Sequence, residues 1–157
     1  MTDAITTPKT TASTRGGLAT REQSLQSTQG TTTIADTVVS KIAGIAAKDV
    51  SGVYTLGGSA SRALGAVRER IPGGRVNHSQ GVSVEVGETQ AAVDIDMIAE
   101  YGVAIADLAA SVRRNVIASI ERMTGLEVTE VNIAVADIHL PDDDQADDDA
   151  DRAPRVQ

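Results

Sequence analysis

The sequence predicts an α+β domain, with a mixed sheet of about four strands and two main helices on one face, in the order α-β-β-β-α-β. Apolar residues recur at helical spacing within residues 34–45 and 105–123. They alternate with polar residues within 82–86 and 93–99, as in strands with one buried face. A final β-α-β unit favours a crossover between parallel strands.

The first helix is predicted from an apolar stripe comprising Ile34, Val38, Ile42 and Ile45. Thr33 is suited to cap its start, with Asp36 three residues on in an approximate capping box. Gly44 is either a weak point or a site of close packing. The helix is expected to end near Ser51, and residues 53–56 to form a short strand.

A hairpin is predicted next, because Val82, Val84 and Val86 alternate with polar residues before the turn at 87–90. The second helix carries the stripe Ile105, Leu108, Val112, Val116, Ile120 and Met123. Gly125 suits its C-terminal left-handed cap, whereas Ala104 is a poor N-cap.

The last strand is predicted within residues 128–140, with Val131, Ile133 and Val135 on one face. Ile138 and Leu140 fall in the opposite phase. Either a bulge near Asp137 restores the phase, or the strand is covered on both faces near its end.

The domain is predicted to span residues 31–141, between two disordered tails. Residues 1–30 are rich in Thr, Ser and Gln and poor in large apolar side chains. Residues 142–157 form an acidic tail that either solubilises the chain or engages a basic segment. Its seven aspartates are Asp142, Asp143, Asp144, Asp147, Asp148, Asp149 and Asp151.

Composition excludes several classes of function. The chain lacks cysteine, which excludes disulfides and thiolate chemistry. The formal net charge of −8 disfavours direct docking on nucleic acid or anionic lipid. We find neither a secretory signal nor an apolar run of the roughly 18 residues that span a bilayer, and therefore expect a soluble, cytoplasmic protein.

The connection at 57–80 contains a basic stretch with a short amphipathic pattern at residues 60–71. It is interpreted as a solvated turn, or as a contact for lipid, nucleic acid or an acidic partner segment. Its cations are Arg62, Arg68, Arg70 and Arg75.

Few residues are candidates for chemistry. Asp94 and Asp96 share a strand face, which Glu85 joins from the partner strand, so acid–base work and cation binding are alternatives to a plain polar face. A polar face is the favoured interpretation. His78 and His139 are expected to be structural or solvent-exposed, since a metal site needs several convergent ligands. We predict no catalytic residue, cofactor or metal.

The sheet face away from the helices is the predicted interaction surface, for self-association through the face or through a strand edge. Its predicted residues are Ser83, Glu85, Asp94, Asp96, Ile98, Asn132 and Ala134.

Three segments resemble the alkaline shock protein family of envelope stress response proteins: IADTVVSKIAGIAAKDVSGV, GVSVEVGETQAAVDIDMIAEYG and MTGLEVTEVNIAVADIHLP. They follow the family's order and cover most of the predicted domain. Ala104 and Ala106 depart from the family, which often has Asn and Pro there. The resemblance implies an abundant, non-enzymatic cytoplasmic protein, held near the membrane by an anchoring partner in some members, which also self-associate. It supplies no catalytic residues.

The predicted function is therefore a scaffold or interaction protein linked to cell-envelope stress. A protein partner is expected to recruit it to the inner face of the membrane, with self-association as a further expectation. The alternative is a small nucleic-acid-binding module that uses the basic 57–80 connection. The charge balance and the scarcity of stacking aromatics weigh against that alternative.

Overall fold

The computed structural model describes residues 25–58 and 76–142. The main elements follow the predicted order: α2 (Asp36–Lys48), β3 (Val53–Leu56), β4 (Val82–Val86), β5 (Gln90–Glu100), α4 (Ile105–Thr124) and β6 (Glu127–His139). The α+β prediction is thus confirmed. The predicted turn of helix at 60–71, the four connection arginines and the acidic run beyond Asp142 lie outside the described residues.

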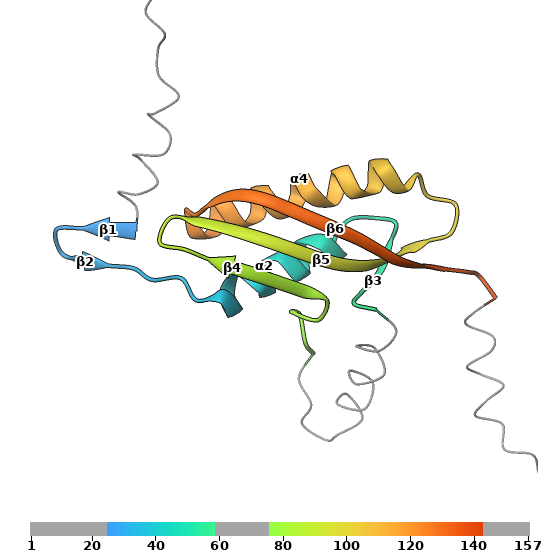
Figure 1. The fold of residues 1–157 in the computed structure, drawn as a ribbon, viewed down its shortest axis with the longest axis horizontal. Coiled ribbons are helices and arrows are strands. Elements are labelled where there is room, and N and C mark those ends of the chain that lie inside the picture. The colour runs from blue at the N-terminus through green and yellow to red at the C-terminus, as the bar shows by residue number, and fades with distance from the viewer. Residues whose placement is uncertain (1–24, 59–75, 143–157) are drawn as a thin grey trace, which may run out of the picture.

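The sheet is organised around β5. β6 pairs with β5 in parallel along its whole length, and the two strands run side by side through the domain (Figure 1). On the other side of β5, β4 pairs antiparallel with residues 91–95 and β3 with residues 97–99. β3 and β4 therefore lie end to end along one edge, and the sheet is mixed, as predicted.

The junction between β3 and β4 is fixed by the backbone of Asp96. Gly57 donates its N–H to the Asp96 carbonyl at 2.7 Å, and the Asp96 N–H donates to Gly81 at 2.8 Å. Gly81 has a φ of +74°, and a Cβ on it would overlap the Gly57 backbone. Glycine is required there because a larger residue meets both strain and a clash.

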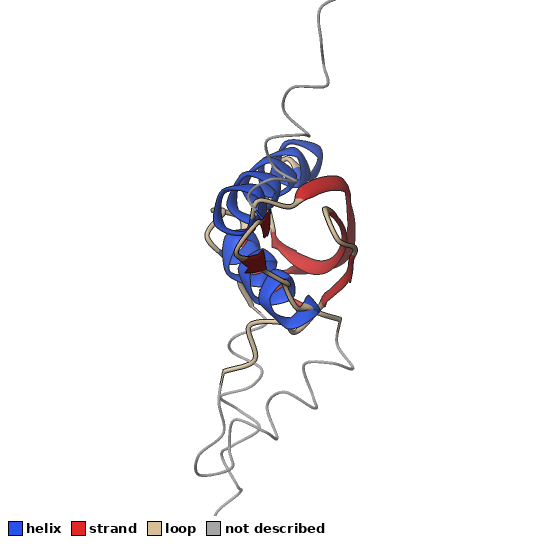
Figure 2. Ribbon diagram, turned by 90° about the vertical axis from the view of Figure 1, so that its left-hand side faces the viewer, coloured by secondary structure: helices blue, strands red, loops and turns tan. Residues whose placement is uncertain are grey.

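Both helices cover one face of the sheet (Figure 2). In α4, Leu108, Val112, Val116 and Ile120 are buried as predicted, whereas Ile105 and Met123, at the two ends of the predicted stripe, are exposed. Gly125 adopts the predicted left-handed cap, and its N–H donates to Glu121. No side chain caps the start of α4 at Ala104.

The predicted stripe of α2 is wrong in phase at two positions. Val38 and Ile45 are exposed, while Val39, Ile42 and several alanines face the core. Small side chains let the helix approach closely, and Gly44 packs directly against the His78 carbonyl. The predicted Thr33 cap is also wrong, because the helix begins after Ala35 with no side-chain cap bond.

The predicted bulge near Asp137 is confirmed. The β5–β6 register shifts between Met97 and Ile98, so that Ala136 is an extra residue in β6. A second shift makes Thr129 extra near the start of the strand. Ile138 consequently returns to the helix-facing phase, opposite Ala99.

A short hairpin precedes α2, formed by β1 (Gln26–Ser27) and β2 (Gly30–Thr31). It lies inside the segment predicted as a tail, so the predicted boundary at residue 31 is too late. Leu25 anchors the hairpin in the core with 7% exposure, and its carbonyl accepts the N–H of Thr32 at 2.7 Å. The polar composition of residues 1–30 gave no sign that this one side chain would be buried.

Candidate interaction surface

The sheet face opposite the helices is called the open face. Along β5, residues 91, 93, 95, 97 and 99 are buried toward the helices, and the residues between them point to the open face. Cross-strand pairing aligns Ser83, Asp94 and Asn132 in one row. Asn132 donates its Nδ2–H to Asp94 Oδ1 at 2.9 Å, which ties β6 to β5 at the surface.

Six of the seven predicted surface residues come together on this face as exposed side chains. They are Ser83, Glu85, Asp94, Asp96, Asn132 and Ala134. None of the six is paired with a cation by the register. This surface is a largely polar area spanning three neighbouring strands.

Charge is divided between the two layers of the domain. Strands β3 to β6 contain seven carboxylates and no lysine or arginine: Glu85, Asp94, Asp96, Glu100, Glu127, Glu130 and Asp137. Among the described residues, every lysine and arginine lies on a helix: Lys41, Lys48, Arg113, Arg114 and Arg122. The sheet layer is therefore negative, which favours cationic partners on the open face.

Ile98 corrects the predicted surface. It has the expected phase but is only 1% exposed, and it does not belong to the helix-side core that contains Met97 and Ala99. Bulges in both neighbouring strands, at Tyr54 and Ala136, lie beside it. Its burial therefore does not come from membership of the helix-side core.

A pair of rings meets across this part of β5. Tyr54 and His139 stack with centroids 3.7 Å apart and planes 9° apart. The two rings come from β3 and β6, the strands on either side of β5, so they meet over β5 near Ile98. Sequence periodicity could not reveal this contact, because the Tyr54 bulge arises from strand pairing.

The residues considered for acid–base chemistry or metal binding do not converge on one site. Asp94 and Asp96 are exposed, His78 is exposed in the turn before β4, and His139 is engaged in the ring stack. Within residues 25–58 and 76–142, no three His, Asp or Glu side chains group as a metal site would require. The arrangement offers polar contacts rather than an enclosed reaction site.

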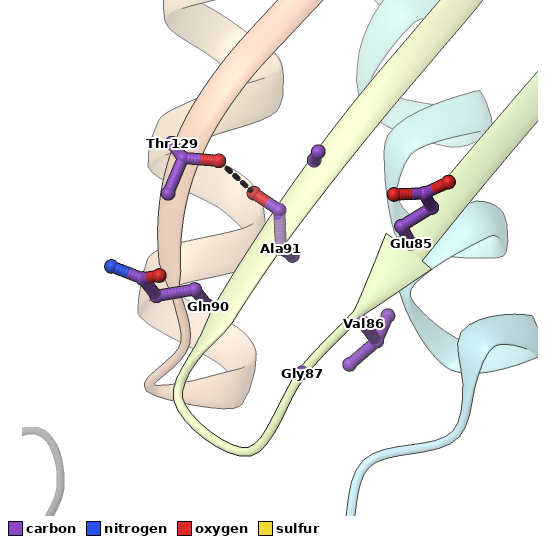
Figure 3. Close-up of a pocket in the computed structure, with 7 residues that line it drawn as sticks. Glu85, Val86, Gly87, Gln90, Ala91 and Thr129 are labelled. Carbon is purple, nitrogen blue, oxygen red and sulfur yellow. Dashed lines mark hydrogen bonds between the residues drawn. The ribbon is translucent and has the colours of Figure 1, made fainter.

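A hollow lies at the hairpin end of the open face, with a volume of about 370 Å³ (Figure 3). Its lining combines β4, β5 and β6: Glu85, Val86, Gly87, Gln90, Ala91, Ala92 and Thr129. Thr129, the extra residue of the first β6 bulge, donates its hydroxyl to the Ala91 carbonyl at 3.3 Å. The hollow extends the open face toward the β4–β5 turn, and no sequence motif indicated it.

No helix in the described part of the chain is both long and apolar enough to cross a membrane.

Comparison with known proteins identifies relatives. Residues 24–140 match the family model of alkaline shock protein 23, described as having a cell envelope-related function. The uncharacterized protein YqhY of Bacillus subtilis is 38% identical over 111 residues, covering 71% of this chain and 78% of that protein.

A stress response regulator gls24 homolog of Streptococcus pyogenes is 36% identical over 113 residues. The match covers 70% of this chain but only 59% of the streptococcal protein. No solved structure matches significantly. The family description names no reaction. The extent of the family match and the identity to YqhY establish that this chain belongs to the alkaline shock protein 23 family, which has a cell envelope-related function.

Proposed function

We propose that the protein is a non-enzymatic scaffold in the response to cell-envelope stress. A protein partner holds it at the inner face of the membrane, and copies of the chain associate with one another. The observation that carries this proposal is the open face, a broad area of sheet that the helices leave uncovered. It presents exposed carboxylates, and strands β3 to β6 contain no lysine or arginine.

Binding fits this surface better than catalysis. Electrostatic catalysis depends on polar groups held in a water-excluded site, where charges act through a low dielectric constant. Asp94 and Asp96 instead lie exposed on β5, and Asp94 accepts a hydrogen bond from Asn132. Such groups suit the polar contacts of a protein interface.

The charge of the open face indicates the chemistry of the partner. A negative surface attracts a basic protein segment and repels both anionic lipid headgroups and nucleic-acid phosphates. Recruitment to the membrane therefore runs through a partner with a lysine- or arginine-rich cytoplasmic segment. The same repulsion weighs against the nucleic-acid alternative.

The test is recovery of membrane proteins on the purified full-length chain. We expect the double variant Asp94→Lys, Asp96→Lys to lose a membrane-protein partner that the unmodified chain retains, because both changes reverse charge on exposed sites. The matched control is Asp49→Lys, Asp142→Lys, which changes the net charge equally at exposed sites outside the sheet strands. Equal loss in both variants, or no loss in either, contradicts the proposal.

A further inference from the structure

The outer edge of β6 exposes backbone groups in a short, defined stretch. Arg113 marks the outer side, since its Nε–H donates to the Val131 carbonyl at 3.0 Å. The β5–β6 register is continuous from Val131 to Val135, so Ile133 and Val135 turn their N–H and C=O groups outward as Val131 does. Among the described residues, no group pairs with these outward backbone groups.

Both ends of this stretch are closed to strand addition. On one side, Arg113 occupies the Val131 carbonyl, and the Glu121 carboxylate accepts the N–H of Val128 at 3.2 Å. On the other side, the bulge at Ala136 interrupts the ladder. Ile133 and Val135 are therefore the residues of this edge that can pair with another strand.

Between its two closed ends, this edge carries no charge or proline that would prevent strand pairing. Proteins protect exposed edges with lysine, proline, inward-pointing charge or a bulge within the strand. Between Val131 and the bulge at Ala136, residues 132–135 read Asn-Ile-Ala-Val, with neither charge nor proline. The side chains of Ile133 and Val135 are half-buried and pack against the helix-side core, so a second strand beside them would cover more of their apolar surface.

We propose that a second copy of this chain occupies the edge, with the two β6 strands antiparallel and Ala134 facing Ala134 of the second copy on a twofold axis. In this register Ile133 forms a hydrogen-bonded pair with Val135 of the other copy. The proposal rests on the self-association proposed above and assigns its surface.

The register of the β6–β6 pair follows from which backbone N–H and C=O groups are available for pairing. Since Ile133 and Val135 flank Ala134, pairing them with each other places Ala134 at a non-hydrogen-bonded position, where opposite Cα atoms come within about 4.5 Å. Alanine is small enough for this approach. A register centred on Ile133 would require the Val131 carbonyl, which Arg113 already occupies.

Cysteine cross-linking tests this geometry directly, because the chain contains no cysteine. We expect Ala134→Cys to give a disulfide-linked dimer under mild oxidation, since the predicted Cα separation lies within disulfide range. Ser83→Cys is the matched control, on the same open face but on β4 rather than β6. It should remain uncross-linked.

A blocking variant provides the second measurement. Ala134 is exposed, so Ala134→Arg should leave the far-UV circular dichroism spectrum unchanged while weakening dimerisation by about tenfold or more, through steric and charge repulsion at the axis. Ser83→Arg should leave dimerisation intact. Light scattering over a concentration series measures both effects.

The outcomes separate this proposal from the broader one. If the unmodified chain stays monomeric at all accessible concentrations, self-association and the edge proposal both fail. If it associates but Ala134→Arg has no effect and the Ala134→Cys variant does not cross-link, the edge is wrong and self-association uses another surface. If Ser83→Arg alone disrupts the oligomer, the edge is likewise wrong and the open face is that surface.

Discussion

Tyr54 and His139 stack ring on ring, 3.7 Å apart, across the central strand of the sheet. Neither strand that supplies a ring pairs with the other, so the contact joins the two sides of β5. The stack lies beside Ile98, which is buried on a face that otherwise presents polar side chains. The polar part of the open face therefore ends at the stacked rings.

Removing either ring should destabilise the domain. We expect Tyr54→Ala or His139→Ala to lower the free energy of unfolding by about 1–2 kcal/mol, because the ring stacking is lost. Urea denaturation of both single variants and the double variant measures their coupling. Tyr101→Ala is the control, since Tyr101 is 69% exposed. Equal effects at Tyr54 and Tyr101 would show that the stack contributes nothing.

Ile98 should behave as a core residue despite its place on the open face. We expect Ile98→Ala to lower the free energy of unfolding by about 2–5 kcal/mol, as for other buried large-to-small changes. Asp96→Ala, two residues away and exposed, should change it by no more than about 0.5 kcal/mol. Thermal denaturation of the two variants compares their stabilities. An Ile98→Ala variant as stable as Asp96→Ala would contradict the role of Ile98 as a core residue.

Gly44 should resist a change that usually strengthens helices. Replacing an interior glycine with alanine normally adds about 1 kcal/mol of stability. A Cβ on Gly44, however, would overlap the His78 carbonyl oxygen, so we expect Gly44→Ala to cost about 1–3 kcal/mol instead. The control is Thr37→Ala on the exposed side of α2, which should gain about 0.5 kcal/mol. A more stable Gly44→Ala protein would refute the close approach.

Asn115 should link the two helices. Its Nδ2–H donates to the Ala46 carbonyl at 2.7 Å in a partly buried contact. We expect Asn115→Ala to lower stability by about 1–2 kcal/mol, whereas Arg114→Ala at an exposed position stays within about 0.5 kcal/mol. Chemical denaturation measures both variants. Equal stabilities would show that the hydrogen bond from Asn115 to Ala46 contributes nothing to linking the helices.

Sequence patterns predicted what depends on local periodicity. The alternation along β5, the buried stripe of α4, the Gly125 cap and the bulge near Asp137 all follow from spacing within one element. These features were enough to predict the order of the elements and six residues of the open face.

The patterns failed where tertiary packing decides. The exposure of Val38 and Ile45 depends on how closely Gly44 and the alanines of α2 approach their neighbours. The stack of Tyr54 on His139, beside the buried Ile98, joins side chains from strands far apart in the sequence. The end-to-end placement of β3 and β4 depends on hydrogen bonds at Asp96 that no local signal specifies.

The most direct test of the central claim is site-specific photo-cross-linking in living cells under envelope stress. A photoreactive residue at Ser83 lies on the open face, and one at Lys41 lies on the exposed side of α2. We predict that the probe at position 83 links the chain to a membrane protein and that the probe at position 41 does not. The same membrane-protein product from both positions, or none from position 83, would contradict the assignment of the open face as the docking surface.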